Sequence, residues 1–207
     1  MENAVNKNKP LSLTDFLRKH SKGILDPIAK FFNRLGVRPN TMTILGLLGS
    51  TIGAILIAQG KMVLGGAFVL IMGPVDALDG AMARLRGESS EFGAFVDSVT
   101  DRYSELVIMG GLLVYYLTKQ DWIGASLVYL AAVGSFLVSY VRARGQSLGF
   151  ETKVGILTRV ERYLVLGPSL VIGQPLIGLG IIAVFANITA LQRILDVRRQ
   201  AHAAKKH

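Results

Sequence analysis

Long apolar stretches, separated by short charged segments, make up most of the chain. The stretches 39–60 and 122–141 contain no charged residue, and the stretch 62–75 is free of charge until it reaches Asp76 and Asp79. A helix that spans a bilayer needs about 20 predominantly apolar residues. The three stretches therefore predict membrane-spanning helices, and the helix that includes 62–75 should carry acidic residues near one of its ends.

The remaining apolar segments are less regular. The stretch 90–118 holds acidic and basic residues in its first half and is apolar in its second half. No residue is charged from 163 to 192, which is too long for one spanning helix, and Pro175 with its neighbouring glycines supplies a break. We therefore expect two helices here, over about 155–174 and 175–192. With the stretch 90–118 as a further span, the number of spans is six.

The segment before the first span mixes apolar and basic side chains. Its apolar residues are Phe16, Leu17, Ile24, Leu25, Ile28, Phe31, Phe32 and Leu35. Beside a bilayer, such a segment is typical of an amphipathic helix that lies in the interface, and a soluble linker is the alternative. The expected fold is an all-α membrane protein with six transmembrane helices preceded by an N-terminal interfacial amphipathic helix.

The expected organisation has three parts. Residues 1–38 form a cytosolic tail and the interfacial helix, residues 39–193 form the six-span domain, and residues 194–207 form a basic cytosolic tail. The composition agrees, because 51% of residues are hydrophobic and 18% are charged, against about 25% charged residues in soluble domains. The absence of cysteine excludes disulfides and thiol nucleophiles.

Basic residues set the orientation. The formal net charge is +9, which in an apolar chain indicates contact with an anionic membrane surface rather than with nucleic acid. With the N-terminus in the cytosol, the 23 Lys and Arg all fall in cytosolic segments except Lys61, Arg102 and Lys119. This is the asymmetry of the positive-inside rule. We expect a multi-pass cell-membrane protein with both termini and the active site on the cytosolic side.

Four aspartates lie where two predicted spans meet a short cytosolic turn. Asp76 and Asp79 are spaced i, i+3, and Asp97 and Asp101 are spaced i, i+4, so each pair projects from one face of its helix. Ionisable groups in membrane helices are costly and mark functional sites. Four carboxylates in one small volume repel unless they are neutralised, and Mg²⁺ or Mn²⁺ prefers such oxygens. The pattern predicts a two-metal site, with salt bridges to nearby arginines as the alternative.

These acids are part of a longer motif. From Asp76 to Asp101 the chain reads D-x2-D-G-x2-A-R-x8-G-x3-D-x3-D. The motif resembles that of the CDP-alcohol phosphatidyltransferases at every specified position. The resemblance implies transfer of a phosphatidyl group from CDP-diacylglycerol, or a similar CDP-lipid, to an alcohol with release of CMP and with two divalent metal ions. It also suggests a homodimer, for which Gly49 and Gly53 offer a face for close packing.

The resemblance also assigns roles to residues. Asp76, Asp79 and Asp97 resemble metal ligands, and Asp101 resembles both a ligand and the general base. The positions that match contacts to the CDP-lipid are Pro39, Asn40, Thr41, Met42, Gly80, Arg84 and Ser90. A helix cap explains Asn40, Thr41 and Ser90 equally well. The role of Glu105, one turn beyond Asp101, stays open.

The acceptor is indicated by basic residues near the cytosolic ends of later spans. The segments SYVRARGQSLG, RVERYLVL and ITALQR resemble the phosphatidylinositol-phosphate synthase branch, with an arginine where that branch typically has lysine. Residues that would bind the acceptor phosphate are Arg142, Arg144, Arg159 and Arg193. The resemblance implies a phosphorylated polyol, first inositol 1-phosphate and then glycerol 3-phosphate. The alternative for these arginines is that they are ordinary flanking charges without a binding role. The alternative function for a protein with acids in its membrane helices is a cation-coupled transporter.

Overall fold

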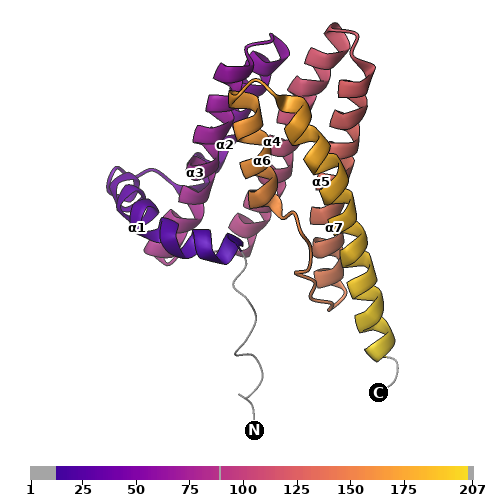
Figure 1. Ribbon diagram of the computed structural model, residues 1–207. Helices are drawn as coiled ribbons and strands as arrows, with labels where there is room; N and C mark the ends of the chain where they lie inside the picture. Colours follow the sequence, from indigo (N-terminus) through magenta and orange to yellow (C-terminus); the bar gives the residue numbers. More distant parts are fainter. Residues whose placement is uncertain (1–12, 89, 205–207) are drawn as a thin grey trace.

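The fold is a helical bundle, seen in a computed structural model that describes residues 13–88 and 90–204, with side chains from residue 23 onward. The described residues form seven helices and no strand: α1 (Leu13–Arg34), α2 (Pro39–Ala58), α3 (Met62–Arg86), α4 (Glu91–Thr118), α5 (Trp122–Ser147), α6 (Arg159–Val171) and α7 (Pro175–Ala204). The α2–α3, α4–α5 and α6–α7 turns lie together at the upper end of the bundle in Figure 1. α1, the α5–α6 segment and the end of α7 lie at the lower end.

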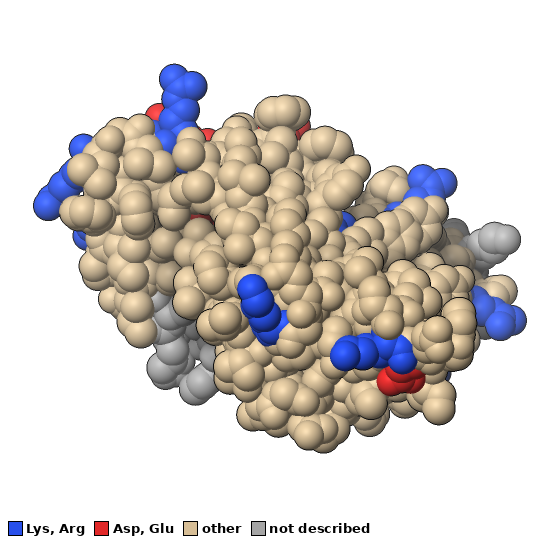
Figure 2. Space-filling view, turned by 90° about the horizontal axis from the view of Figure 1, so that it is seen from above, with Lys and Arg blue, Asp and Glu red and all other residues tan. Residues whose placement is uncertain are grey.

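The surface and the lengths of the helices suit a membrane. Large apolar side chains are exposed on the outside of the bundle, for example Ile44, Leu64 and Ile123, whose exposed fractions are 57%, 57% and 74%. The upper end, seen in Figure 2, is mostly uncharged, with only a few charged side chains. Four helices, namely α2, α3, α5 and α7, are long and apolar enough to cross a bilayer. The protein is therefore a multi-pass membrane protein.

The structure corrects the predicted fifth span. Helix α6 begins at Arg159 rather than near Gly155, because Gly155 has a φ of 137°, which an α-helix cannot contain. A capping box of Thr158 and Glu161 fixes the start. The 13 residues of α6 rise only about 20 Å, less than the roughly 30 Å thickness of the hydrocarbon core. Helix α4 is long enough, but it carries charged residues through its first half.

Glycines allow the helices to approach each other closely. A Cβ on Gly111 of α4 would lie 2.9 Å from the Cα of Ala54 on α2, and a Cβ on Gly53 would lie 3.2 Å from the carbonyl oxygen of Gly65 on α3. Gly49 similarly packs against the side chain of Met72 on α3. The glycines of α2 that were predicted to offer a dimer face therefore serve packing within the chain.

Helix α1 is tied to the C-terminal end of α3. The guanidinium of Arg86 donates to the side-chain oxygen of Asn33 at 2.7 Å and to the carbonyl oxygen of Val37 at 2.6 Å. The amide of Asn33 donates in turn to the carbonyl oxygen of Met82 at 3.2 Å. Leu25, Ala29 and Phe32 of α1 belong to a small apolar cluster with residues of α2 and α3. We call the set of hydrogen bonds around Arg86 the α1 clamp.

Candidate active site

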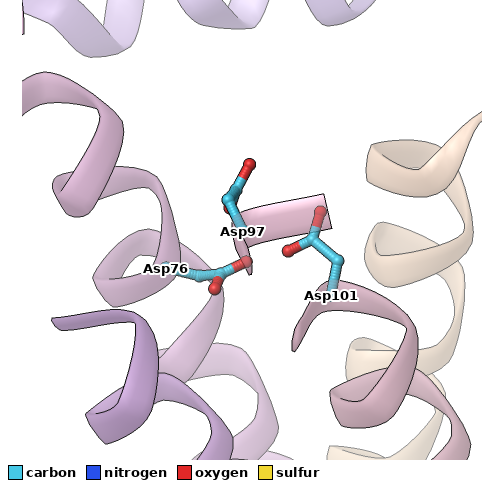
Figure 3. A group of neighbouring side chains, drawn as sticks. All are labelled: Asp76, Asp97 and Asp101. Carbon is cyan, nitrogen blue, oxygen red and sulfur yellow. The ribbon is translucent and has the colours of Figure 1, made fainter. Parts of the chain in front are cut away.

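Three carboxylates surround one small space between the C-terminal half of α3 and the N-terminal half of α4. Asp76 comes from α3, and Asp97 and Asp101 come from one face of α4 (Figure 3). One carboxylate oxygen from each of the three lies within 4.8 Å of those of the other two. Helix α2 packs against both α3 and α4 and so fixes the position of one helix relative to the other. The structure thus brings together three of the four predicted metal ligands.

Asp79, the fourth predicted ligand, is hydrogen-bonded to its own surroundings. Its carboxylate accepts from the hydroxyl of Thr43 on α2 at 2.5 Å and from the backbone N–H of Gly80. The side chain is buried, with 6% exposed, yet it borders the same cavity as the other three acids. Thr43 was not among the predicted site residues. It lies one residue beyond the predicted lipid-contacting segment 39–42.

A cavity of about 520 Å³ connects these acids. One part of its lining is charged and includes the aspartates, Arg84 and Arg159. Another part is apolar and includes Ile108, Leu166 and Ile182. Its lining also includes Leu164, which is 44% exposed, so the cavity is open to the surface beside an apolar residue of α6. A cavity of this composition suits a molecule with a charged head and an apolar body.

Arg159 lies inside the acidic group. Its guanidinium contacts the Asp76 carboxylate at 2.5 Å and the Asp101 carboxylate at 2.6 Å. The side chain begins at the first residue of α6 and remains 43% exposed. A single positive charge therefore bridges the acids of α3 and α4, and it partly offsets the repulsion between them.

The acids suit a hard divalent cation. Asp76 Oδ1 and Asp101 Oδ1 are buried and have no hydrogen-bond partner within the part of the chain that the structure describes. A buried carboxylate oxygen without a partner is strongly unfavourable. Mg²⁺ and Mn²⁺ bind such oxygens readily. Asp76, Asp97 and Asp101 are thus the residues that could hold a metal ion.

Some of the residues predicted to contact the CDP-lipid line the cavity and the others do not. Gly80 and Arg84 line the cavity. Ser90 caps α4, because its hydroxyl accepts from the backbone N–H of Gly93 at 3.0 Å. Asn40 and Thr41 lie inside the first turn of α2 and are exposed, since the N-cap is Arg38 and the helix begins at Pro39. Met42 is buried in the apolar cluster between α1, α2 and α3.

Of the four predicted acceptor arginines, one lines the cavity and three do not. Arg159 lines the cavity, whereas Arg142 and Arg144 are exposed in the last turns of α5. Arg193 on α7 is 3% exposed and donates to the carbonyl oxygens of Val154 at 2.9 Å and Val138 at 2.7 Å. In this arrangement Arg193 joins α7 to α5 and to the segment before α6.

A buried ion pair beside the acids was not predicted. Arg162, only 1% exposed, donates to the two carboxylate oxygens of Glu105 at 2.7 and 2.9 Å. The pair joins α6 to α4 one turn beyond Asp101. Its only sequence signal was Glu105 itself, an acid at i+4 from Asp101 whose partner lies 57 residues away.

Comparison with known proteins identifies the family. A family model described as CDP-alcohol phosphatidyltransferase matches residues 36–192, which is more than half of the chain. The chain belongs to the CDP-alcohol phosphatidyltransferase family. It is therefore a transferase, and the motif from Asp76 to Asp101 supplies four of the acids that line the cavity, namely Asp76, Asp79, Asp97 and Asp101.

Several members of the CDP-alcohol phosphatidyltransferase family resemble the chain over most of its length. It is 34% identical over 209 residues to a phosphatidylinositol phosphate synthase of Streptomyces avermitilis, with 93% of this chain and 85% of that protein covered. It is 32% identical over 185 residues to an archaetidylinositol phosphate synthase of Pyrococcus horikoshii, with 89% and 96% covered.

Solved structures of one family member are also similar. The phosphatidylinositol phosphate synthase of Mycobacterium tuberculosis with CDP-DAG bound gives a TM-score of 0.78 at 32% identity, with 84% of this chain and 93% of that chain covered. The same enzyme in complex with manganese and citrate gives a TM-score of 0.77, with 84% and 88% covered.

Proposed function

We propose that this protein transfers the phosphatidyl group of CDP-diacylglycerol to a hydroxyl of inositol 1-phosphate and releases CMP. The observation that carries the proposal is the group of Asp76, Asp97 and Asp101, whose carboxylate oxygens meet within 4.8 Å on the wall of a cavity with an apolar extension. The relatives named phosphatidylinositol phosphate synthase support inositol phosphate as the acceptor. The relative crystallised with CDP-DAG supports the lipid donor.

The reaction exchanges one phosphate ester for another. The acceptor hydroxyl oxygen forms a bond to the phosphorus that carries the diacylglycerol, and the bond from this phosphorus to the oxygen of CMP breaks. Asp101, as general base, takes the hydroxyl proton. Asp76, Asp79, Asp97 and Asp101 would hold two Mg²⁺ or Mn²⁺ ions. When bound, these ions supply neutralisation of the diphosphate and of the charge that develops during transfer.

The remaining roles follow the charges of the cavity. Arg84 would meet the diphosphate of the CDP-lipid beside Gly80, and the segment 39–42 with Ser90 would lie against the nucleotide. Arg159, with Arg142, Arg144 and Arg193, would bind the acceptor phosphate, for which guanidinium groups are suited by geometry and charge. Of these four, Arg159 is the most direct candidate, because it already lines the cavity.

The membrane arrangement is part of the proposal. We infer six passes over 39–193, formed by α2 to α7, in which the short α6 crosses together with the flanking residues of the stretch 155–174. The segment 1–38, which includes α1, and the tail 194–207 would lie in the cytosol; residues 1–12 and 205–207 lie outside the described residues. The exposed apolar side chains of Ile24, Ile28 and Phe31 support contact of α1 with the membrane interface. A homodimer in the cell membrane completes the proposal.

The test is an acceptor panel. Purified protein with CDP-diacylglycerol and Mg²⁺ would be given inositol 1-phosphate, glycerol 3-phosphate, inositol or serine, with CMP release as the readout. We expect release with inositol 1-phosphate, its loss in excess EDTA and its recovery with Mg²⁺ or Mn²⁺. Release with glycerol 3-phosphate alone would replace the acceptor. Undiminished release in EDTA would overturn the metal site, and ion flux in proteoliposomes without any CMP release would indicate a transporter.

A further inference from the structure

The hydroxyl of Tyr163 on α6 inserts into the backbone of α3. It accepts a hydrogen bond from the N–H of Gly73 at 3.0 Å and donates one to the carbonyl oxygen of Val69. These are the two groups, four residues apart, that pair with each other in a regular α-helix. A side chain that enters this ladder is a known cause of a local opening or bend in a helix.

The neighbouring residues favour such an opening. Pro74 lies inside α3, and it has no N–H to donate to the carbonyl oxygen of Leu70. Gly73 has no side chain, and a Cβ at this position would collide with the end of the Tyr163 ring. In a bilayer, a backbone group released from the helix must find a partner inside the protein. In the turn before Pro74, the Tyr163 hydroxyl supplies such a partner to the N–H of Gly73 and to the carbonyl oxygen of Val69.

The turn that the Tyr163 hydroxyl contacts leads directly into the acidic group. Asp76 follows Pro74 by two residues, and its carboxylate is one of the three that meet within 4.8 Å. On its other side, Asp76 approaches Gly46 of α2, where a Cβ would lie 3.4 Å from the Asp76 carboxylate oxygen. The direction in which Asp76 leaves α3 therefore depends on the shape of the turn 69–73, to which α6 contributes the two hydrogen bonds of the Tyr163 hydroxyl.

We propose that Tyr163 is a positioning residue, whose hydroxyl holds the α3 turn before Asp76 and thereby sets where this carboxylate stands opposite Asp97 and Asp101. The proposal rests on the proposed function only in that the three acids bind a metal ion. Tyr163 itself contacts backbone atoms and takes no part in proton transfer. Removing its hydroxyl should therefore change metal binding and turnover while the fold is kept.

The test compares Tyr163→Phe, which removes only the hydroxyl, with Tyr129→Phe, a matched change at a side chain that is 66% exposed on α5. Mn²⁺ affinity of the purified protein would be measured by calorimetry, without lipid substrate. Hydrogen–deuterium exchange would be followed in peptides that cover residues 69–76. We expect Tyr163→Phe to weaken Mn²⁺ binding by about tenfold, the scale of one lost hydrogen bond in a charged site, and to alter exchange over 69–76. Tyr129→Phe should do neither.

Each outcome decides a separate point. Unchanged Mn²⁺ affinity with altered exchange would overturn the positioning role and leave Tyr163 as a packing residue. If both hydrogen–deuterium exchange over 69–76 and Mn²⁺ affinity were unchanged, the Tyr163 hydroxyl would not stabilise the α3 turn, and the proposal would be wrong. If wild-type protein bound no Mn²⁺, the proposed metal site would fail, and the exchange measurement would still decide whether the hydroxyl holds the turn.

Discussion

Asp101, like Asp76, uses its two carboxylate oxygens in different ways. It is buried, with 8% exposed, and one oxygen contacts Arg159 at 2.6 Å while the other has no partner among the described residues. Asp97, on the preceding turn, is half-buried. A buried carboxylate with one free oxygen can both approach a metal ion and accept a proton from a hydroxyl.

The first prediction separates binding from chemistry at this residue. Asp101→Asn keeps the size of the side chain but removes the base. We expect kcat to fall by about 100-fold or more, the usual scale for a lost general base, while CDP-lipid binding with Mg²⁺ stays within about tenfold. Asp76→Asn should instead weaken metal-dependent nucleotide binding. Calorimetry beside turnover would show the difference, and normal turnover by Asp101→Asn would exclude it as the base.

Arg159 gives a second prediction at the scale of one residue, because its charge lies against two proposed metal ligands. Arg159→Gln removes that charge, so Mn²⁺ binding should tighten, by about tenfold for a partly solvent-screened pair. If the arginine also binds the acceptor phosphate, the acceptor KM should rise by roughly ten- to a hundredfold.

The two effects have opposite signs, which distinguishes them from general damage to the fold. Arg198→Gln, which removes the same charge from an exposed position on α7, is the control and should change neither quantity. Weaker Mn²⁺ binding in Arg159→Gln would show that the ion pairs support the site rather than oppose the cation.

At the scale of helices, the bundle depends on backbone contact at glycines. Gly111 and Gly110 are neighbours on α4, and a Cβ on Gly111 would meet the Ala54 backbone of α2 whereas a Cβ on Gly110 would meet nothing within 4 Å. Gly111→Ala should force α2 and α4 apart and lower the thermal midpoint in detergent by several degrees, as overpacking costs about 1–3 kcal/mol.

Gly110→Ala is the matched control for this third prediction. It adds the same methyl group toward open space and improves helix propensity, so the midpoint should stay or rise slightly. Equal midpoints for the two variants, measured by the loss of folded protein on heating, would mean that α2 and α4 do not meet as closely as described.

Uncharged runs in the sequence predicted four of the helices well, since a long run without charge leaves few alternatives to a spanning helix. The start of α6 was missed because the run does not show where the backbone leaves the helix; Gly155 and the cap of Thr158 decide that. The acids were found through their spacing. The pair of Arg162 with Glu105 was not, because it joins residues far apart in the sequence and depends on how α6 packs on α4.

For the whole molecule, the absence of cysteine makes the membrane orientation directly measurable. Lys119 lies in the α4–α5 turn at the upper end of the bundle, and Arg198 lies near the end of α7 at the lower end; both are exposed. The fourth prediction is that Lys119→Cys in intact cells reacts with a membrane-impermeant maleimide. Arg198→Cys should react only after the membrane is permeabilised. The reverse pattern would invert the proposed topology.

The α1 clamp has a consequence for how a lipid reaches the acids. Leu25 and Asp26 of α1 form part of the cavity wall, and the three hydrogen bonds of the α1 clamp fasten Asn33 of α1 and the following Val37 to α3. Together such bonds are worth about 3 kcal/mol, so α1 would be detached only about 1% of the time. Loading past α1 would therefore require this minor state. An entry sideways from the bilayer, past Leu164, would avoid it, and the supply of substrate would then depend on diffusion within the membrane plane.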